Sequence, residues 1–205
     1  MHTSIYTKFQ IKHLINDLNL GNVVALGTDT VMGLVARIDM PQAFIKLKEI
    51  KGRSANKPFP IMVSSLTQLN KIALLTKRDL KLIDKWFPGP ITFIFNKNPN
   101  YKNVGIGDTI AIRIPDDEIL NEIVAGLDRP IFLTSANKSN QPTTKLASEV
   151  LKIFDKEVAS ILMHDALGYK ASTIIDATGE KLKEIRAGKI SLKRVLESLE
   201  ELDER

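Results

Sequence analysis

The sequence predicts a mixed α/β protein, also describable as α+β, built on a mixed sheet flanked by helices. Two observations support this fold class. Segments with helical periodicity and segments of β-branched apolar residues follow one another along the chain, but their alternation is irregular. Strand-like segments are also concentrated in the second half, whereas a regular doubly wound protein would alternate strand and helix throughout.

Apolar spacing and capping residues place the expected helices. Four apolar residues at i, i+3, i+4 and i+7 predict an amphipathic helix over residues 8–20, which Gly21 ends. Most of the other expected helices begin at a residue whose side chain can cap the helix. In chain order, these run from Asp39 to Lys51, from Thr76 to Trp86 with Asp79 completing a capping box, from Asp116 to Gly126, over 146–154, and from Ser191 onward.

Short runs rich in β-branched and aromatic residues, bounded by turn residues, predict the strands. The first two runs are separated by the polar turn Thr28-Asp29-Thr30, and the last two are expected to pair as a hairpin. The expected strands are 22–28, 33–39, 59–64, 91–96, 109–115, 131–135, 158–164, 172–177 and 181–186.

The chain has no internal repeat and no Ser-, Pro- or Gly-rich linker that would divide it. Its 205 residues, 43% of them apolar, are enough to bury a core. We therefore expect a single domain over 1–205, with its core over about 8–190 and a C-terminal helix over about 191–203.

Several protein classes are excluded by composition. Without cysteine, the chain can form no disulfide, no cysteine-ligated zinc site and no thiol nucleophile. Its apolar runs are far shorter than the about 20 residues that span a bilayer, and the N-terminus lacks the apolar region of a signal peptide. We expect a cytoplasmic protein with no membrane association.

The positive charge is concentrated in one part of the chain. The whole chain has a net charge of +5, but residues 46–102 hold 12 Lys and Arg against 3 Asp and Glu, a local charge of +9. For most of these lysines a solvated surface is the better interpretation. The cluster Lys51, Arg53 and Lys57 lies in a loop with Gly and Pro, where an anionic ligand is the better interpretation.

Common catalytic motifs are absent from the sequence. There is no Walker-type phosphate loop and no nucleophile elbow, and the Gly105-Ile-Gly107 segment does not complete a dinucleotide-binding fingerprint. His2, His13 and His164 are too scattered to predict a zinc site. Phosphate binding would therefore need Arg, Lys, hydroxyl groups and backbone amides.

Three polar segments supply such groups in expected loops. They are Thr28-Asp29-Thr30, the Lys51–Pro58 segment KGRSANKP, and Thr134-Ser135-Ala136-Asn137. Taken singly, each also fits a structural role, because the first fits a simple turn, the second a helix C-terminus with basic residues, and the third a helix N-cap.

Taken together and in order, these segments resemble the YrdC/Sua5/TsaC family. The matching stretches are GTDTVMGL, KGRSANKPFPIMV, WFPGPITFIF, TIAIRIP, LTSANKSNQPT, STIID and IRAGKI. The paired KxR and SxN elements of the family correspond here to Lys51-Gly52-Arg53 and Ser135-Ala136-Asn137. The similarity extends over about residues 8–190, so we expect the short, single-domain type of this family.

This resemblance implies a fold and an activity. The implied fold is a strongly twisted mixed sheet with a basic cleft. The implied enzyme is a nucleotidyltransferase that forms threonylcarbamoyl-AMP and pyrophosphate from L-threonine, bicarbonate or CO2, and ATP. Mg²⁺ would arrive on the ATP phosphates, without a dedicated protein metal site. A partner transferase complex would use the product to modify tRNA.

The resemblance also implies roles for particular residues, matched position by position. Arg113 could pair through two hydrogen bonds with an amino-acid carboxylate. The implied catalytic residues are Lys51 and Arg53. The implied ATP-binding residues are Arg53, Lys57, Thr109, Ser135, Asn137, Thr143 and Arg186, and the implied threonine-binding residues are Thr30, Arg113 and Ser172.

The sequence departs from the family pattern near the expected threonine pocket. Gly27 replaces a proline and is expected to loosen the loop, Asp29 replaces a glutamate, and Met32 replaces an aromatic residue. Met62 stands where some relatives carry a histidine, and Asn140 replaces a glycine, a mild change because Asn tolerates positive φ.

Two alternatives remain open at this point. The basic segment could instead belong to a non-catalytic module that binds double-stranded RNA or tRNA weakly, with a steep dependence on salt. With 6% aromatic residues and no RNP-like motif, sequence-specific base stacking is not expected. Carbamoyl transfer of the hydrogenase-maturation kind would need acylphosphatase and zinc-finger segments that the chain lacks.

Overall fold

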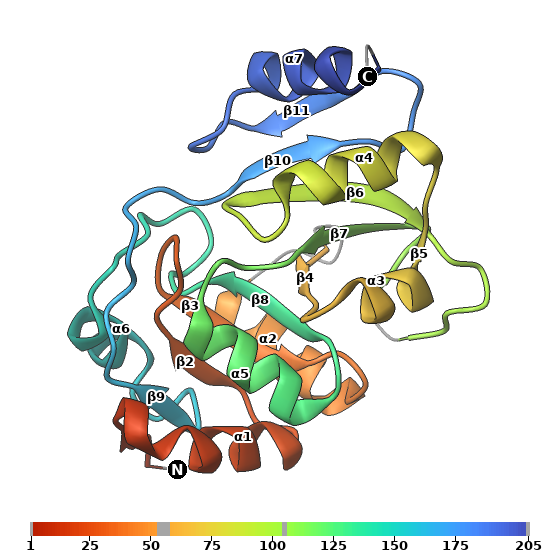
Figure 1. Cartoon of the computed structure of the whole chain (residues 1–205). Coiled ribbons are helices and arrows are strands. Elements are labelled where there is room, and N and C mark those ends of the chain that lie inside the picture. Colours follow the sequence, from red (N-terminus) through yellow and green to blue (C-terminus); the bar gives the residue numbers. More distant parts are fainter. Residues whose placement is uncertain (1, 53–57, 104–105, 204–205) are drawn as a thin grey trace.

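The computed structural model describes residues 2–52, 58–103 and 106–203 (Figure 1). In these residues eleven strands join one sheet in the order β1-β9-β2-β3-β8-β4-β7-β6-β10-β11, with β5 paired to β6 outside this order. The strands are β1 (Ser4–Tyr6), β2 (Val24–Leu26), β3 (Gly33–Arg37), β4 (Ile61–Met62), β5 (Ala73–Leu74), β6 (Ile91–Lys97), β7 (Thr109–Arg113), β8 (Ile131–Ser135), β9 (Ser160–Leu162), β10 (Thr173–Asp176) and β11 (Lys183–Arg186).

The sheet is mixed, as the sequence predicts. Strand β9 pairs in parallel with β1 and β2, and the pairs β4–β7 and β6–β10 are also parallel. The remaining pairs are antiparallel, including the expected β10–β11 hairpin, which has a register shift between Ile174 and Ile175. The irregular order of helices and strands therefore did indicate mixed pairing.

Helices flank this sheet at several places (Figure 1). Helix α1 packs against α5 and against β2, β3 and β9, whereas α2 packs on β3 and α4 packs on α7. The helices are η1 (Lys8–Gln10, 3-10), α1 (Ile11–Asn19), α2 (Pro41–Lys51), α3 (Leu66–Ile72), α4 (Lys77–Trp86), α5 (Glu118–Leu127), α6 (Ala147–Phe154) and α7 (Leu192–Asp203).

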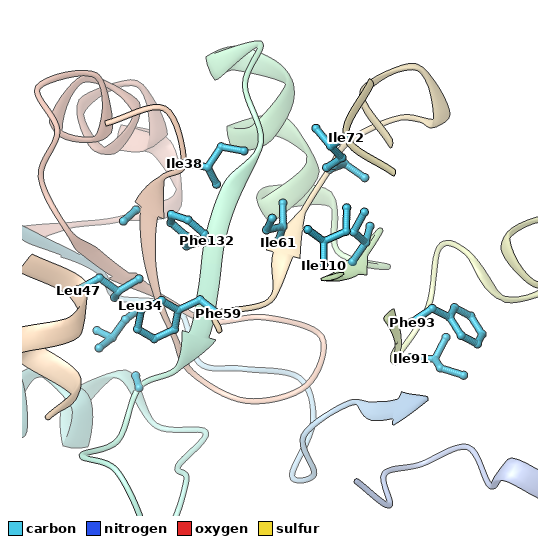
Figure 2. Close-up of a cluster of buried hydrophobic side chains, with 14 of the residues drawn as sticks. Leu34, Ile38, Leu47, Phe59, Ile61, Ile72, Ile91, Phe93, Ile110 and Phe132 are labelled. Atoms are coloured by element: carbon cyan, nitrogen blue, oxygen red, sulfur yellow. The ribbon is translucent and has the colours of Figure 1, made fainter. Parts of the chain in front are cut away.

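Alternation along the strands builds two hydrophobic clusters, one on each face of the sheet. On β3, Leu34 belongs to the larger cluster and Val35 to the smaller one, and both are fully buried. Figure 2 shows Leu34 in the larger cluster beside Leu47, Phe59 and Phe132. The smaller cluster is formed with residues of α1 and α5.

The same alternation leaves polar groups on one face of the central strands. On β6 and β7, Phe93 and Ile112 point into the larger cluster, and Figure 2 shows Phe93 there. Their neighbours Thr92, Ala111 and Arg113 therefore lie on the opposite face. All three line a cavity on that face.

The expected cap at Asp39 is wrong. Helix α2 begins after Met40, which makes no side-chain capping hydrogen bond, and Pro41 occupies the first turn. The Asp39 carboxylate instead accepts hydrogen bonds from the Arg37 guanidinium at 2.9 and 2.7 Å. A charged partner outcompetes the helix amides for this side chain.

Helix α5 begins and ends slightly later in the chain than predicted. Its N-cap is Asp117 rather than Asp116, because the Asp117 carboxylate accepts from the Leu120 amide at 2.9 Å. The helix continues past Gly126 and ends at Leu127, followed by Asp128 with a φ of 47°. Asp tolerates this left-handed conformation, so Asp128 rather than Gly126 closes the helix.

Other helix ends are confirmed. Thr76 and Asp79 form the capping box of α4, with Thr76 Oγ1 accepting from the Asp79 amide at 3.2 Å. Ser191 Oγ accepts from the Arg194 amide at 3.3 Å at the start of α7, and Gly21 follows α1 with a φ of 79°. Three elements, β1, α3 and β5, were not predicted, because they have at most seven residues and little periodicity.

Candidate functional site

A cavity of about 390 Å³ lies on the polar face of the central strands. Its lining combines apolar residues of the sheet with hydroxyl groups and two guanidinium groups. Five of the predicted site residues take part in this lining: Thr30, Arg113, Ser135, Ser172 and Arg186.

Arg113 lies at the end of β7 and is 2% exposed. Its Nε donates to the Gly89 carbonyl at 2.7 Å, and its Nη1 donates to Thr30 Oγ1 at 3.3 Å. Its Nη2 donates to the carboxylate of Asp29, with which it forms a buried ion pair. Three hydrogen bonds to two segments, the Gly89 loop and the Asp29-Thr30 turn, therefore fix the plane of this guanidinium.

Two buried carboxyl groups lie near Arg113. Burial raises the pKa of Asp29; Arg113 opposes this rise and Asp117 adds to it. Burial likewise raises the pKa of Asp117, although its hydrogen bond from the Leu120 amide acts in the opposite direction. Burial lowers the pKa of Arg113, and Asp29 and Asp117 favour its charged form.

A hydrogen-bonded turn after β2 presents Thr30 to the cavity. Thr28 Oγ1 donates to the Val31 carbonyl at 2.7 Å and accepts from the amides of Thr30 and Val31 at 3.1 and 3.2 Å. Because a hydroxyl has one hydrogen, the 2.9 Å contact between the Thr28 and Thr30 hydroxyls has Thr30 as the donor. Thr30 Oγ1 remains an acceptor for Arg113.

Backbone packing around this turn depends on two glycines. A Cβ at Gly27 would lie 2.4 Å from the His164 carbonyl oxygen, and one at Gly168 would lie 2.5 Å from the Thr30 carbonyl oxygen. The expectation that Gly27 loosens the loop is therefore corrected: Gly27 is buried and lets the His164 segment approach the turn.

A second chain of polar groups, which connects β6 to β11, lines the same cavity. Thr92 and Ser172 share a hydrogen bond of 2.9 Å between their hydroxyls. Arg186 donates through Nε to the Ser172 carbonyl at 3.0 Å and through Nη2 to Ser172 Oγ at 3.1 Å. Thr92 was missed by the sequence analysis, although a threonine inside the apolar run ITFIF was a usable signal.

The KxR and SxN elements meet through Lys51. Its Nζ donates to the Ser135 carbonyl at 2.6 Å, to the Asn137 carbonyl at 2.5 Å and to Asn137 Oδ1 at 2.7 Å. Asn137 Oδ1 also accepts from Ser135 Oγ at 2.6 Å, and Asn137 Nδ2 donates to the Gln141 carbonyl. Lys51 is 3% exposed, and it is not among the described residues that line the cavity.

The other predicted ATP-binding residues lie outside the cavity lining or outside the described residues. Thr109 is exposed on β7, on the same face as Arg113, four residues away. Thr143 is exposed in the loop before α6, and Asn137 is buried behind Ser135. Arg53 and Lys57 fall in 53–57, outside the described residues, so their roles stay predictions.

Among residues 2–52, 58–103 and 106–203, no three His, Asp or Glu side chains gather as metal ligands. Over the same part of the chain, no helix has the length and apolar character needed to cross a membrane.

The fold and the site define a class: mixed-sheet α/β proteins with a cavity that holds buried cationic and hydroxyl groups. The family model Sua5_yciO_yrdC, described as "Telomere recombination", matches residues 16–188, and this chain belongs to that family.

Named relatives and a solved structure agree with this membership. A protein of Methanocaldococcus jannaschii is 34% identical over 189 residues, covering 92% of this chain and 88% of the relative. A threonylcarbamoyl-AMP synthase of Psychromonas ingrahamii is 32% identical, covering 85% of this chain and 96% of the relative. The crystal structure of Pyrococcus abyssi Sua5 complexed with L-threonine superposes with a TM-score of 0.88 at 28% identity, covering 96% of this chain but 61% of the Sua5 chain.

Proposed function

We propose that this chain is a threonylcarbamoyl-AMP synthase. It combines L-threonine, bicarbonate or CO2, and ATP, and it releases pyrophosphate. The observation that carries this proposal is the buried Arg113, held by Gly89, Thr30 and Asp29 at the wall of a cavity. Relatives named threonylcarbamoyl-AMP synthase and a relative complexed with L-threonine support the choice of substrate.

The reaction needs no nucleophile from the protein. The amine of threonine takes up CO2 and becomes a carbamate, and a carbamate oxygen then attacks the α-phosphorus of ATP. The bond from the α-phosphorus to the bridging oxygen breaks, and pyrophosphate leaves with the electron pair. The protein's tasks are to align the substrates and to offset negative charge. The lack of cysteine is compatible with this chemistry.

The amino acid would bind at the Arg113 end of the cavity. A guanidinium has five N–H donors, and three of those of Arg113 are used within the protein. The remaining two can hold a carboxylate. Thr30 and Ser172 line the same cavity and offer hydroxyl oxygens to the rest of the amino acid.

The nucleotide would extend from Ser135 and Arg186 along the cavity. Arg53, Lys57, Thr109 and Thr143 are the further ATP contacts that we propose from the matched motifs, with Mg²⁺ bound to the phosphates as part of the substrate. Asn137 and Lys51 would act by positioning, since their polar groups bind one another and Ser135. Lys51 would thus support catalysis without touching the reacting atoms.

We place the product in tRNA modification. An acyl adenylate is reactive and short-lived in water, so a transferase complex must accept the threonylcarbamoyl group and pass it to tRNA. A cytoplasmic location fits that role. The comparisons do not favour the alternative of a non-catalytic RNA-binding module.

The proposal is tested by mixing the protein with ATP, Mg²⁺ and bicarbonate, with and without L-threonine, and measuring pyrophosphate. We expect release that depends on threonine. Release equal to that of the control without threonine would contradict the proposal.

A further inference from the structure

The charged groups around Arg113 are balanced in number before any ligand binds. Arg113 and Asp29 form an ion pair in which the side chains are 2% and 9% exposed. Asp117 is 8% exposed and acts electrostatically on both of them. Arg186, which also lines the cavity, adds one positive charge. Two positive and two negative groups therefore act on the place where the carboxylate is proposed to bind: Arg113 and Arg186 line the cavity, and Asp29 and Asp117 lie outside its lining.

The two oxygens of the Asp29 carboxylate have different surroundings. Oδ2 accepts from Arg113, whereas Oδ1 is buried and meets no donor with good hydrogen-bond geometry among the described residues, although the Asp116 amide lowers the pKa of this carboxyl group. Charges in such surroundings are screened weakly, because little water separates them. A ligand carboxylate bound to Arg113 would therefore lie within a few ångströms of a second carboxylate.

The effect of Asp29 on binding depends on the net charge of the ligand. A simple carboxylate would gain the attraction of Arg113 but suffer the repulsion of Asp29. A zwitterionic amino acid bears an ammonium group next to its carboxylate, and this group is attracted by Asp29 and Asp117. The two kinds of ligand share the same contact with Arg113 and differ in how they respond to the acidic groups.

We propose that Asp29 is a specificity-determining residue, which makes the Arg113 pocket select a zwitterionic amino acid over carboxylates of net negative charge. This inference rests on the proposed function, because it takes an amino acid as the ligand of Arg113. Without Asp29, the pocket would hold a buried guanidinium that also attracts simple anions.

The test compares two ligands in two proteins by titration calorimetry. L-threonine is the zwitterion, and 3-hydroxybutyrate is the same molecule without the ammonium group. Asp29→Asn removes one charge and keeps the shape of the side chain. We expect this change to shift the affinity ratio toward 3-hydroxybutyrate by about tenfold. If the substitution also disorders Arg113, the affinities for both ligands fall by the same factor, and their ratio does not change.

Two further variants make the result specific. Asp116→Asn removes the same charge from an exposed carboxylate whose effect on the pKa of Asp29 is smaller than that of Asp117, and it should change the ratio by less than about threefold. Asp29→Glu keeps the charge and should retain the ratio of the unchanged protein. Asp29→Ser should reproduce the shift of Asp29→Asn, so the test does not depend on the folding of one variant, which thermal unfolding checks.

The outcomes separate this inference from the proposed function. If the unchanged protein binds L-threonine but the ratio is the same in Asp29→Asn and Asp29→Ser, Asp29 does not set specificity and the proposed function stands. If the unchanged protein binds no L-threonine and releases no pyrophosphate, the proposed function fails, and the inference fails with it.

Discussion

The ammonium group of Lys51 donates to the side-chain carbonyl of Asn137 at 2.7 Å, although 86 residues separate them. Two further bonds reach the carbonyls of Ser135 and Asn137, so the end of α2 is fastened to the loop after β8. One buried cation thus organises both polar segments that the sequence singled out as KxR and SxN.

We expect Lys51→Met to destabilise the protein by about 2–4 kcal/mol. The change leaves buried oxygens without a donor, and each such group costs about 1–3 kcal/mol, less where water can enter. Urea unfolding measures the loss. Lys46→Met is the matched control, because Lys46 is exposed on the same helix and pairs with Glu49 at 3.9 Å. It should change stability by less than about 0.5 kcal/mol.

We expect Arg113→Lys to lower kcat/KM for threonine by on the order of a hundredfold and to leave the KM for ATP nearly unchanged. A lysine keeps the charge but cannot hold Gly89, Thr30, Asp29 and a ligand carboxylate at once. Steady-state release of pyrophosphate at varied threonine measures the effect. Arg129→Lys, at a guanidinium that is 53% exposed, should leave both parameters unchanged. An equal loss for both substrates would contradict a role at the amino acid.

We expect Gly27→Ala to destabilise the protein by about 1–3 kcal/mol, because the new methyl group would lie 2.4 Å from the His164 carbonyl oxygen. Thermal and urea unfolding measure the change. Gly107→Ala is the control, since a Cβ there meets nothing within 4 Å. If both variants unfold alike, the close approach at Gly27 is not what stabilises this turn.

We expect Asp39→Asn to cost about 0.5–1 kcal/mol at pH 7, and the difference to disappear in acid. The hydrogen bonds from Arg37 lower the pKa of Asp39, whereas partial burial opposes this effect. A carboxyl group with a lowered pKa stabilises the folded state above its ordinary pKa of about 4, and this contribution is lost as the pH falls through the lowered value. Unfolding of both proteins between pH 7 and about 3 tests this. A difference that grows in acid would contradict it.

Most of the fold could be predicted because its elements follow local rules. The box of Thr76 and Asp79 caps α4 as expected, and alternation in β6 and β7 assigns Phe93 and Thr92 to opposite faces. Asp39 and Asp117 could not be assigned correctly, since neighbouring polar groups compete for each carboxylate. Which group binds the carboxylate depends on distances in the folded protein, and no local sequence pattern contains these distances.

The sequence predicts several residues of the site, but it does not predict the contacts between them. Matched motifs named Thr30, Arg113 and Ser172, which do line one cavity. They did not indicate that Asp29 pairs with Arg113, that Thr92 supports Ser172, or that Lys51 is bound by Ser135 and Asn137. These relationships arise because strands distant in sequence become neighbours in the sheet.

The central claim is tested most directly by mass spectrometry of the adenylate product after the protein is mixed with ATP, Mg²⁺, bicarbonate and L-threonine. Isotopically labelled bicarbonate should place its carbon in a species with the mass of threonylcarbamoyl-AMP, and omission of threonine should remove that species. A reaction that consumes ATP without forming the labelled adenylate, or no reaction at all, would contradict the account.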